Sequence, residues 1–138
     1  MTDQELVQRA LEMRKFSYAP ILILQWARLS YARDGTVFTG CNVENAAYGS
    51  TLCAERTALV KAVSEGRTTG WTTLAIAGSG EDFCWPCGAC RQMLYEFAPK
   101  LRCWRSISMA SFSRQAYGTA SHGIWTGIVK MKLRVVRA

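Results

Sequence analysis

Three segments of the chain repeat apolar side chains every three or four residues, the spacing of one helix face. They predict helices over residues 3–16, 52–64 and 88–97. Thr2 and Glu5 form a capping box before the first helix, and Gly66 is the expected end of the second. The side chains expected to face the core are Ala58, Leu59, Ala62 and Val63 in the second helix and Met93, Leu94 and Phe97 in the third.

Strand-like segments alternate with these helices. Residues 36–41 follow the turn-forming pair Asp34-Gly35 and predict a short strand. Residues 74–77 predict a short buried strand, and residues 21–31 are rich in strand-forming side chains but alternate poorly. Beyond Lys100 the periodicity is weak and predicts no element. Strands that alternate with helices indicate a layered α/β domain.

The composition fits a single folded domain over residues 1–138. Apolar residues make up 49% of the chain, which is enough for a core. No run of about 18 uncharged apolar residues is present, so we expect no membrane span. The stretch from Met1 to Glu12 is polar and amphipathic, unlike a signal peptide. We therefore expect a cytoplasmic protein.

The net charge of +7 comes entirely from the C-terminal part of the chain. Residues 1–100 contain ten basic and ten acidic side chains, whereas residues 101–138 contain seven basic side chains and no acidic one. Proteins that bind nucleic acid usually carry clustered basic residues on the folded domain. The balanced charge of residues 1–100 therefore argues against a nucleic-acid partner, and the tail differs in composition from the rest.

The cysteines favour metal binding or catalysis over a disulfide framework. The chain has six of them without a predicted signal peptide. Cys87 and Cys90 form a Cys-x-x-Cys pair, and Cys53 stands two residues before a glutamate. The remaining three, which are Cys41, Cys84 and Cys103, are interpreted as buried or incidental thiols.

Cys53-Ala54-Glu55 and Pro86-Cys87-Gly88-Ala89-Cys90 each begin a predicted helix. Helix N-termini favour thiolate over thiol. Three thiolates leave one position of a four-coordinate Zn²⁺ open for water, whose pKa the metal lowers. Glu55 can reach that water without binding the metal and can move protons to and from a substrate.

Two other interpretations of these residues are open. Cys53, Cys87 and Cys90 could form a structural zinc knuckle, but a fourth ligand would be needed and the only histidine, His122, lies in the atypical tail. Arg56 could offset the negative charge of three thiolates by hydrogen bonding to a ligand sulfur, or it could be an ordinary solvated helix arginine. We favour a catalytic site with Arg56 at a ligand sulfur.

Two runs of sequence closely resemble the small cytidine deaminases of pyrimidine salvage: residues 40–48, continuing through 53–58, and residues 86–92. The resemblance is strong over 33–98 and loose over 3–20. It implies a three-layer α/β/α fold with a mixed five-stranded sheet. It also implies hydrolytic deamination of cytidine and 2′-deoxycytidine by Glu55, with Zn²⁺ held by Cys53, Cys87 and Cys90. A homotetramer whose sites are completed by neighbouring subunits is expected.

The same resemblance assigns the ribose hydroxyls to Asn42 and Glu44. A carboxylate accepts from a sugar hydroxyl, and an amide can both donate and accept. Asparagine is also common in turns, which is the alternative interpretation. The complete Asn-x-Glu-Asn pattern beside the zinc motif favours ribose binding and separates the chain from blasticidin-type deaminases, which lack it.

Two segments depart from the family. Residues 21–31 replace the motif Tyr-Ser-x-Phe-x-Val-Gly-Ala-Ala-Leu-Leu, and Leu24 stands where a phenylalanine packs against the pyrimidine. Reading these codons one base early permits the family motif, so we infer a frameshift near Pro20 that is restored near Ala32. Residues 119–127 read one base late permit the family's C-terminal signature, and the departure covers about 101–138.

Two alternative functions follow from these features. The disrupted segments suggest a catalytically impaired zinc-binding homologue. A polynucleotide deaminase is disfavoured by the balanced charge of residues 1–100 and by the ribose-binding pair Asn42 and Glu44. A small nucleoside substrate remains the leading interpretation.

Overall fold

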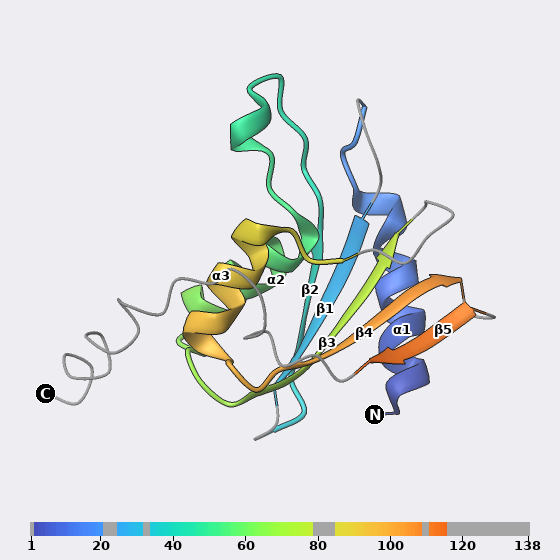
Figure 1. Ribbon diagram of the computed structural model, residues 1–138, viewed down its shortest axis with the longest axis vertical. Helices are drawn as coiled ribbons and strands as arrows, with labels where there is room; N and C mark the ends of the chain where they lie inside the picture. Colours follow the sequence, from blue (N-terminus) through green and yellow to red (C-terminus); the bar gives the residue numbers. More distant parts are fainter. Residues whose placement is uncertain (1, 21–24, 32–33, 79–84, 109–110, 116–138) are drawn as a thin grey trace, which may run out of the picture.

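The computed structural model describes residues 2–20, 25–31, 34–78, 85–108 and 111–115. One sheet lies between helices in three layers, which are visible in Figure 1. The elements in chain order are α1 (Asp3–Glu12), the 3-10 helix η1 (Met13–Phe16), β1 (Gln25–Tyr31), β2 (Val37–Cys41), the 3-10 helix η2 (Tyr48–Ser50), α2 (Ala54–Ser64), β3 (Trp71–Gly78), α3 (Gly88–Phe97), β4 (Arg102–Ser108) and β5 (Ser111–Gln115).

Among the described residues, the sheet has five strands in the order β2-β1-β3-β4-β5. Of these neighbours only β3 and β4 pair in parallel, and α3 lies between them in the chain. The other neighbours are antiparallel, and Ala27 of β1 lies between Gly40 of β2 and Ile76 of β3. A parallel pair requires a crossover connection, so α3 is held against the sheet by the strands at both of its ends.

The two faces of β3 are covered by different helices. Leu74 and Ile76 belong to the larger core with α2 and α3, whereas Ala75 and Ala77 contact Ala10 of α1. Successive side chains of a strand point to opposite faces. This alternation explains why nearly every residue of β3 is buried, and it confirms the α/β class with helices on both sides of the sheet.

α2 lies unusually close to β2. A Cβ atom at Gly40 would overlap the carbonyl oxygen of Ala54 and lie 2.6 Å from the Ala58 nitrogen. Two side chains of α2 reinforce the contact: Thr57 Oγ1 donates to the Cys41 carbonyl at 3.0 Å, and Lys61 Nζ donates to the Thr39 carbonyl at 2.7 Å. Only glycine allows this approach of helix to strand, so Gly40 sets the position of α2 on the sheet.

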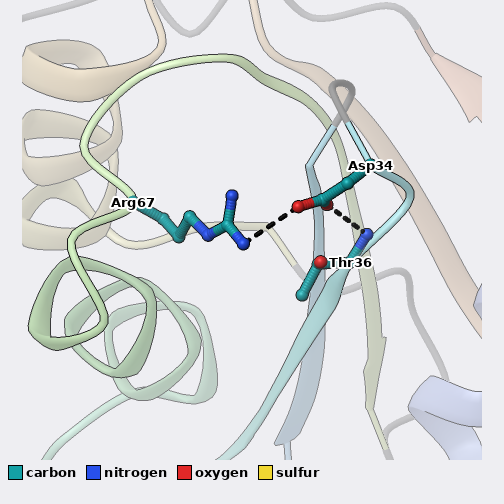
Figure 2. A network of polar contacts seen from close by, with 3 residues as sticks. All are labelled: Asp34, Thr36 and Arg67. Carbon is teal, nitrogen blue, oxygen red and sulfur yellow. Dashed lines mark hydrogen bonds and ion pairs between the residues drawn. The ribbon is translucent and has the colours of Figure 1, made fainter.

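The turn before β2 is tied to the end of α2. Asp34 Oδ1 accepts from the Thr36 amide at 2.9 Å, and Asp34 Oδ2 pairs with Arg67 Nη2 at 2.9 Å, as Figure 2 shows. Gly35 has φ +72°, which the predicted Asp-Gly turn requires. The ion pair is substantially exposed, so its contribution is at most about 1 kcal/mol.

Several predicted boundaries differ from the structure. The predicted helix over 3–16 ends at Glu12 and continues as η1, because the Met13 amide bonds to the Ala10 carbonyl and tightens the last turn. Leu52 lies outside α2, because its amide donates to Val43 instead. β3 extends beyond the predicted strand 74–77 at both ends.

Other predictions are confirmed, and some lie beyond the described residues. The Thr2–Glu5 capping box and the bounds of α3 are as expected. β4 and β5 lie where no element was predicted. Leu24, Cys84, His122 and residues 116–138 lie outside the described residues. None of the described helices is long and apolar enough to cross a membrane.

We predict that Gly40→Ala lowers the free energy of unfolding by about 3 kcal/mol or more, the upper end for an overpacked core. The obstacle is the backbone of α2 and not a flexible side chain. Denaturant unfolding measures the change. Gly49→Ala is the matched control, because a Cβ atom there meets nothing within 4 Å. Equal losses in both variants would contradict a specific role for Gly40.

Candidate metal centre and active site

Three cysteine sulfurs gather where α2 and α3 begin. Cys53 is the N-cap of α2, Cys87 is the N-cap of α3, and Cys90 lies in the first turn of α3. The Sγ atoms of Cys53 and Cys87 are 3.8 Å apart, those of Cys87 and Cys90 are 3.4 Å apart, and all three lie within 4.8 Å of one another. Tetrahedral zinc with Zn–S bonds of about 2.3 Å separates its sulfurs by about 3.8 Å. The cluster therefore has the spacing of a single zinc ion.

The Cys53 thiol is the more acidic of the pair Cys53 and Cys90. Its pKa is lowered to about 5, first by a hydrogen bond with Cys90 and then by contacts with Arg56 and Cys87. The same hydrogen bond raises the pKa of Cys90, and burial adds to the rise. A divalent cation is needed to hold all three as thiolates.

Glu55 is buried beside the cluster with one oxygen unsatisfied. Its side chain is 1% exposed, and Oε2 has no hydrogen-bond partner among the described residues. Burial raises the pKa of Glu55 to about 7, and the charge of nearby Cys53 contributes to the rise. An unsatisfied buried carboxylate oxygen is costly, and a pKa near neutrality suits a group that both takes and gives protons. Glu55 is outside the group of metal-ligating residues.

Arg56 contacts the cluster from its outer side. Its Nη2 atom donates to the Thr51 carbonyl at 2.7 Å and lies 3.9 Å from Cys53 Sγ. The side chain is half-buried and not extended into solvent. The structure thus brings together the four residues that the sequence motif named around the metal, which are Cys53, Cys87, Cys90 and Arg56, with Glu55 next to them.

Asn42 and Glu44 follow directly after β2 and are both buried. Val43 between them is exposed, so the two polar side chains share the opposite side of the backbone. The segment is fixed on both sides. Val43 and Leu52 exchange two backbone hydrogen bonds of 2.9 and 3.0 Å, while Tyr18 bonds to the backbone of Asn42 and Glu44 at 3.2 and 2.8 Å.

Sequence reasoning missed the residues that hold this region in shape. The Asn45 amide donates to Thr51 Oγ1 at 3.3 Å, and Asn45 Oδ1 accepts from the Ala47 amide at 2.9 Å. The second bond is an Asx turn, for which an asparagine followed by small residues is a recognisable signal. Nothing in the sequence indicated that the Thr51 carbonyl would meet Arg56.

Comparison with known proteins identifies the family. Residues 1–104 match the family model described as the cytidine and deoxycytidylate deaminase zinc-binding region. The chain belongs to this family.

Individual members agree with the family assignment. A cytidine deaminase of Halalkalibacterium halodurans is 42% identical over 99 residues, which cover 72% of this chain and 74% of that protein. The crystal structure of cytidine deaminase from Burkholderia pseudomallei superposes with a TM-score of 0.81 at 34% identity, covering 91% of this chain and all of that one. The structure from Mycobacterium leprae gives 0.65 at 31% identity, with 83% and 93% covered.

Zinc is the metal that the donor set of this deaminase-family chain fits. Three sulfurs at zinc spacing satisfy three of four tetrahedral positions, which is the arrangement of a catalytic site with one open position. The other two cysteines among the described residues lie elsewhere: Cys103 is buried in the core, and Cys41 Sγ contacts the Phe16 carbonyl at 3.3 Å. The prediction that they are not ligands agrees with this placement.

We predict that Cys87→Ala abolishes tight binding of zinc, because two sulfurs cannot hold the ion as three do. Purified wild-type protein should contain about one zinc per chain by elemental analysis, and the variant well below that. Cys41→Ala is the control, since its sulfur contacts a backbone carbonyl instead of the cluster. Unchanged zinc content in Cys87→Ala would contradict the assigned ligands.

Proposed function

We propose that this protein hydrolyses cytidine to uridine and ammonia in a zinc-dependent reaction, and that it acts on 2′-deoxycytidine as well. The observation that carries the proposal is the buried, unpartnered oxygen of Glu55 beside a three-sulfur metal centre. A proton-transfer group held next to an open metal position fits a reaction in which water attacks and ammonia leaves. The named relatives are cytidine deaminases, which supports this substrate.

Glu55 performs the proton transfers. When bound, zinc supplies a water molecule whose pKa is lowered toward neutrality. Glu55 takes a proton from that water and gives it to the pyrimidine N3 atom. The water oxygen adds to C4. Glu55 then takes the remaining proton of this oxygen and gives it to the exocyclic amino group, which leaves as ammonia when its bond to C4 breaks. A carboxyl with a pKa of about 7 can do both, because it is readily protonated and readily deprotonated near neutral pH.

Arg56 balances the charge of the metal centre. Three thiolates and one divalent cation sum to a single negative charge, which would oppose the deprotonation of water. The guanidinium near Cys53 Sγ offsets that charge. Contacts of this kind to a metal ligand commonly change affinity or activity by about 10- to 100-fold.

Asn42 and Glu44 bind the ribose. Support comes from their burial on one side of a segment whose backbone is held by Tyr18 and Leu52. A rigid backbone fixes the direction of both side chains, and a carboxylate paired with an amide suits the hydroxyls of a sugar. A site of this kind would prefer a nucleoside over the free base.

The protein acts in pyrimidine salvage in the cytoplasm, as a homotetramer. Free thiols that must hold a metal persist in a reducing compartment. Large side chains exposed near the substrate segment, including Tyr18 (62%) and Tyr48 (69%), would be covered by neighbouring subunits. The family-model match over residues 1–104 includes both the zinc motifs and these exposed side chains.

We also infer that residues 21–31 and about 101–138 are read from shifted frames. The family-model match ends at residue 104, and the remaining chain carries basic side chains without an acidic one. Activity would be reduced by Leu24 in place of an aromatic ring, because ring contacts contribute about 0.5–1.5 kcal/mol beyond the area they bury. Sequencing the coding DNA across codons 18–34 and 98–130 tests this inference directly.

We predict that Glu55→Gln keeps its zinc but loses cytidine deamination by about 10²- to 10⁴-fold, the usual contribution of a general acid–base group. Glutamine preserves the shape of the buried side chain, so the fold should be unaffected. Ammonia release and zinc content are measured on the same samples. Loss of zinc in this variant would show that Glu55 is a ligand. A zinc-loaded wild type without turnover would instead identify an impaired homologue.

We predict that Asn42→Ala and Glu44→Gln each lower kcat/KM for cytidine by about 10- to 100-fold, because removing one partner of a buried hydrogen bond costs about 1–3 kcal/mol. Zinc content should stay at the wild-type level. Free cytosine is the control substrate, since it lacks the ribose. If wild-type protein deaminates cytosine as well as cytidine, the ribose assignment is wrong.

A further inference from the structure

One nitrogen of Arg56 serves two partners. Nη2 donates to the Thr51 carbonyl oxygen at 2.7 Å and lies 3.9 Å from Cys53 Sγ. Arg56 Nε is buried and has no hydrogen-bond partner among the described residues. In the part of the chain that the structure describes, the carbonyl of Thr51 is therefore the short contact that fixes the guanidinium. Moving this carbonyl would move the positive charge relative to the sulfur.

Thr51 is the last residue of a loop that is closed by its own hydrogen bonds, the segment Asn45–Thr51. Thr51 Oγ1 accepts from the Asn45 amide at 3.3 Å, and the Thr51 amide donates to the Tyr48 carbonyl at 3.1 Å. The turn at its start is held by Asn45 Oδ1, which accepts from the Ala47 amide. The side-chain hydroxyl and the amide of Thr51 are thus both held by hydrogen bonds within the loop. These two contacts fix the direction in which the Thr51 carbonyl points.

We propose that Thr51 is a positioning residue of the metal centre: the segment Asn45–Thr51 aims its carbonyl so that the Arg56 guanidinium is held near Cys53 Sγ. The inference rests on the metal centre in the proposed function but not on the reaction. Because the coupling between two parts of a protein is reciprocal, zinc that orders Arg56 also stabilises the segment.

The first experiment compares the zinc affinity of three variants by competition with a chromophoric chelator. Thr51→Val keeps the shape of the side chain but removes the hydroxyl, so zinc affinity should fall by about tenfold, the lower end for contacts that orient a metal ligand. Thr51→Ser keeps the hydroxyl and should retain wild-type affinity. Ser50→Ala is the control, because Ser50 lies in the same loop and is exposed.

A double-mutant cycle then shows whether the effect passes through Arg56. In an Arg56→Gln background, Thr51→Val should cause no further loss of zinc affinity, because the group that Thr51 positions is gone. An equal loss in both backgrounds would overturn the proposal, as would wild-type affinity in Thr51→Val. A variant that fails to fold is recognised by circular dichroism.

Hydrogen exchange of the wild-type protein gives a test that needs no Thr51 variant. The peptide that contains residues 45–52 should exchange more slowly with zinc than without it, and this difference should disappear in zinc-saturated Arg56→Gln. If zinc does not change the exchange of this peptide in the wild type, the proposal is overturned.

A wild-type protein that takes up no zinc would overturn the proposal together with the metal centre. Zinc binding that depends on Thr51 without deamination would support the inference and contradict the proposed reaction.

Discussion

The contact between the backbone of α2 and Gly40 of β2 governs the arrangement of the whole site. Asn42 and Glu44 continue the chain from β2, whereas Cys53, Glu55 and Arg56 occupy the start of α2. A methyl group at this position would push α2 away from β2. The residues that follow β2 and those at the start of α2 would then move apart by about the width of that group. A misplacement of about 1 Å can cost about 10²-fold in rate, and hydrogen bonds weaken as their atoms move apart. The absence of a side chain at Gly40 is therefore a condition for the chemistry as well as for packing.

The larger core also fixes the position of α3 on the sheet. Leu59 of α2, Leu74 of β3 and Leu94 of α3 belong to one buried cluster, so the two helices that carry the sulfurs are packed on a common face of the sheet. Packing within this cluster holds the two helices together, and zinc would join their starts. This packing explains how Glu55 can stay buried with an unsatisfied oxygen: the surrounding packing bears a cost of about 1–3 kcal/mol that local bonds do not offset.

The sequence predicted what is local and missed what depends on tertiary contact. α3 was predicted with its correct bounds, because Cys87 caps it and its apolar positions repeat regularly. The metal cluster could be foreseen because each half of it is a short motif at a helix start. β4 was missed because its pairing with β3 joins residues about thirty positions apart and leaves no periodic signal of its own. The contact from Arg56 to Thr51 was missed because it depends on how a loop folds back.

The polar bonds along β2 also limit how copies of this protein can associate. In the described part of the chain β2 is an edge strand, yet the carbonyls of Thr39 and Cys41 are taken by Lys61 and Thr57. Just beyond the strand, Tyr18 occupies the backbone of Asn42 and Glu44. An open strand edge invites pairing with another chain, and here the acceptors for such pairing are already used. Extension of the sheet by another chain is thereby disfavoured along β2.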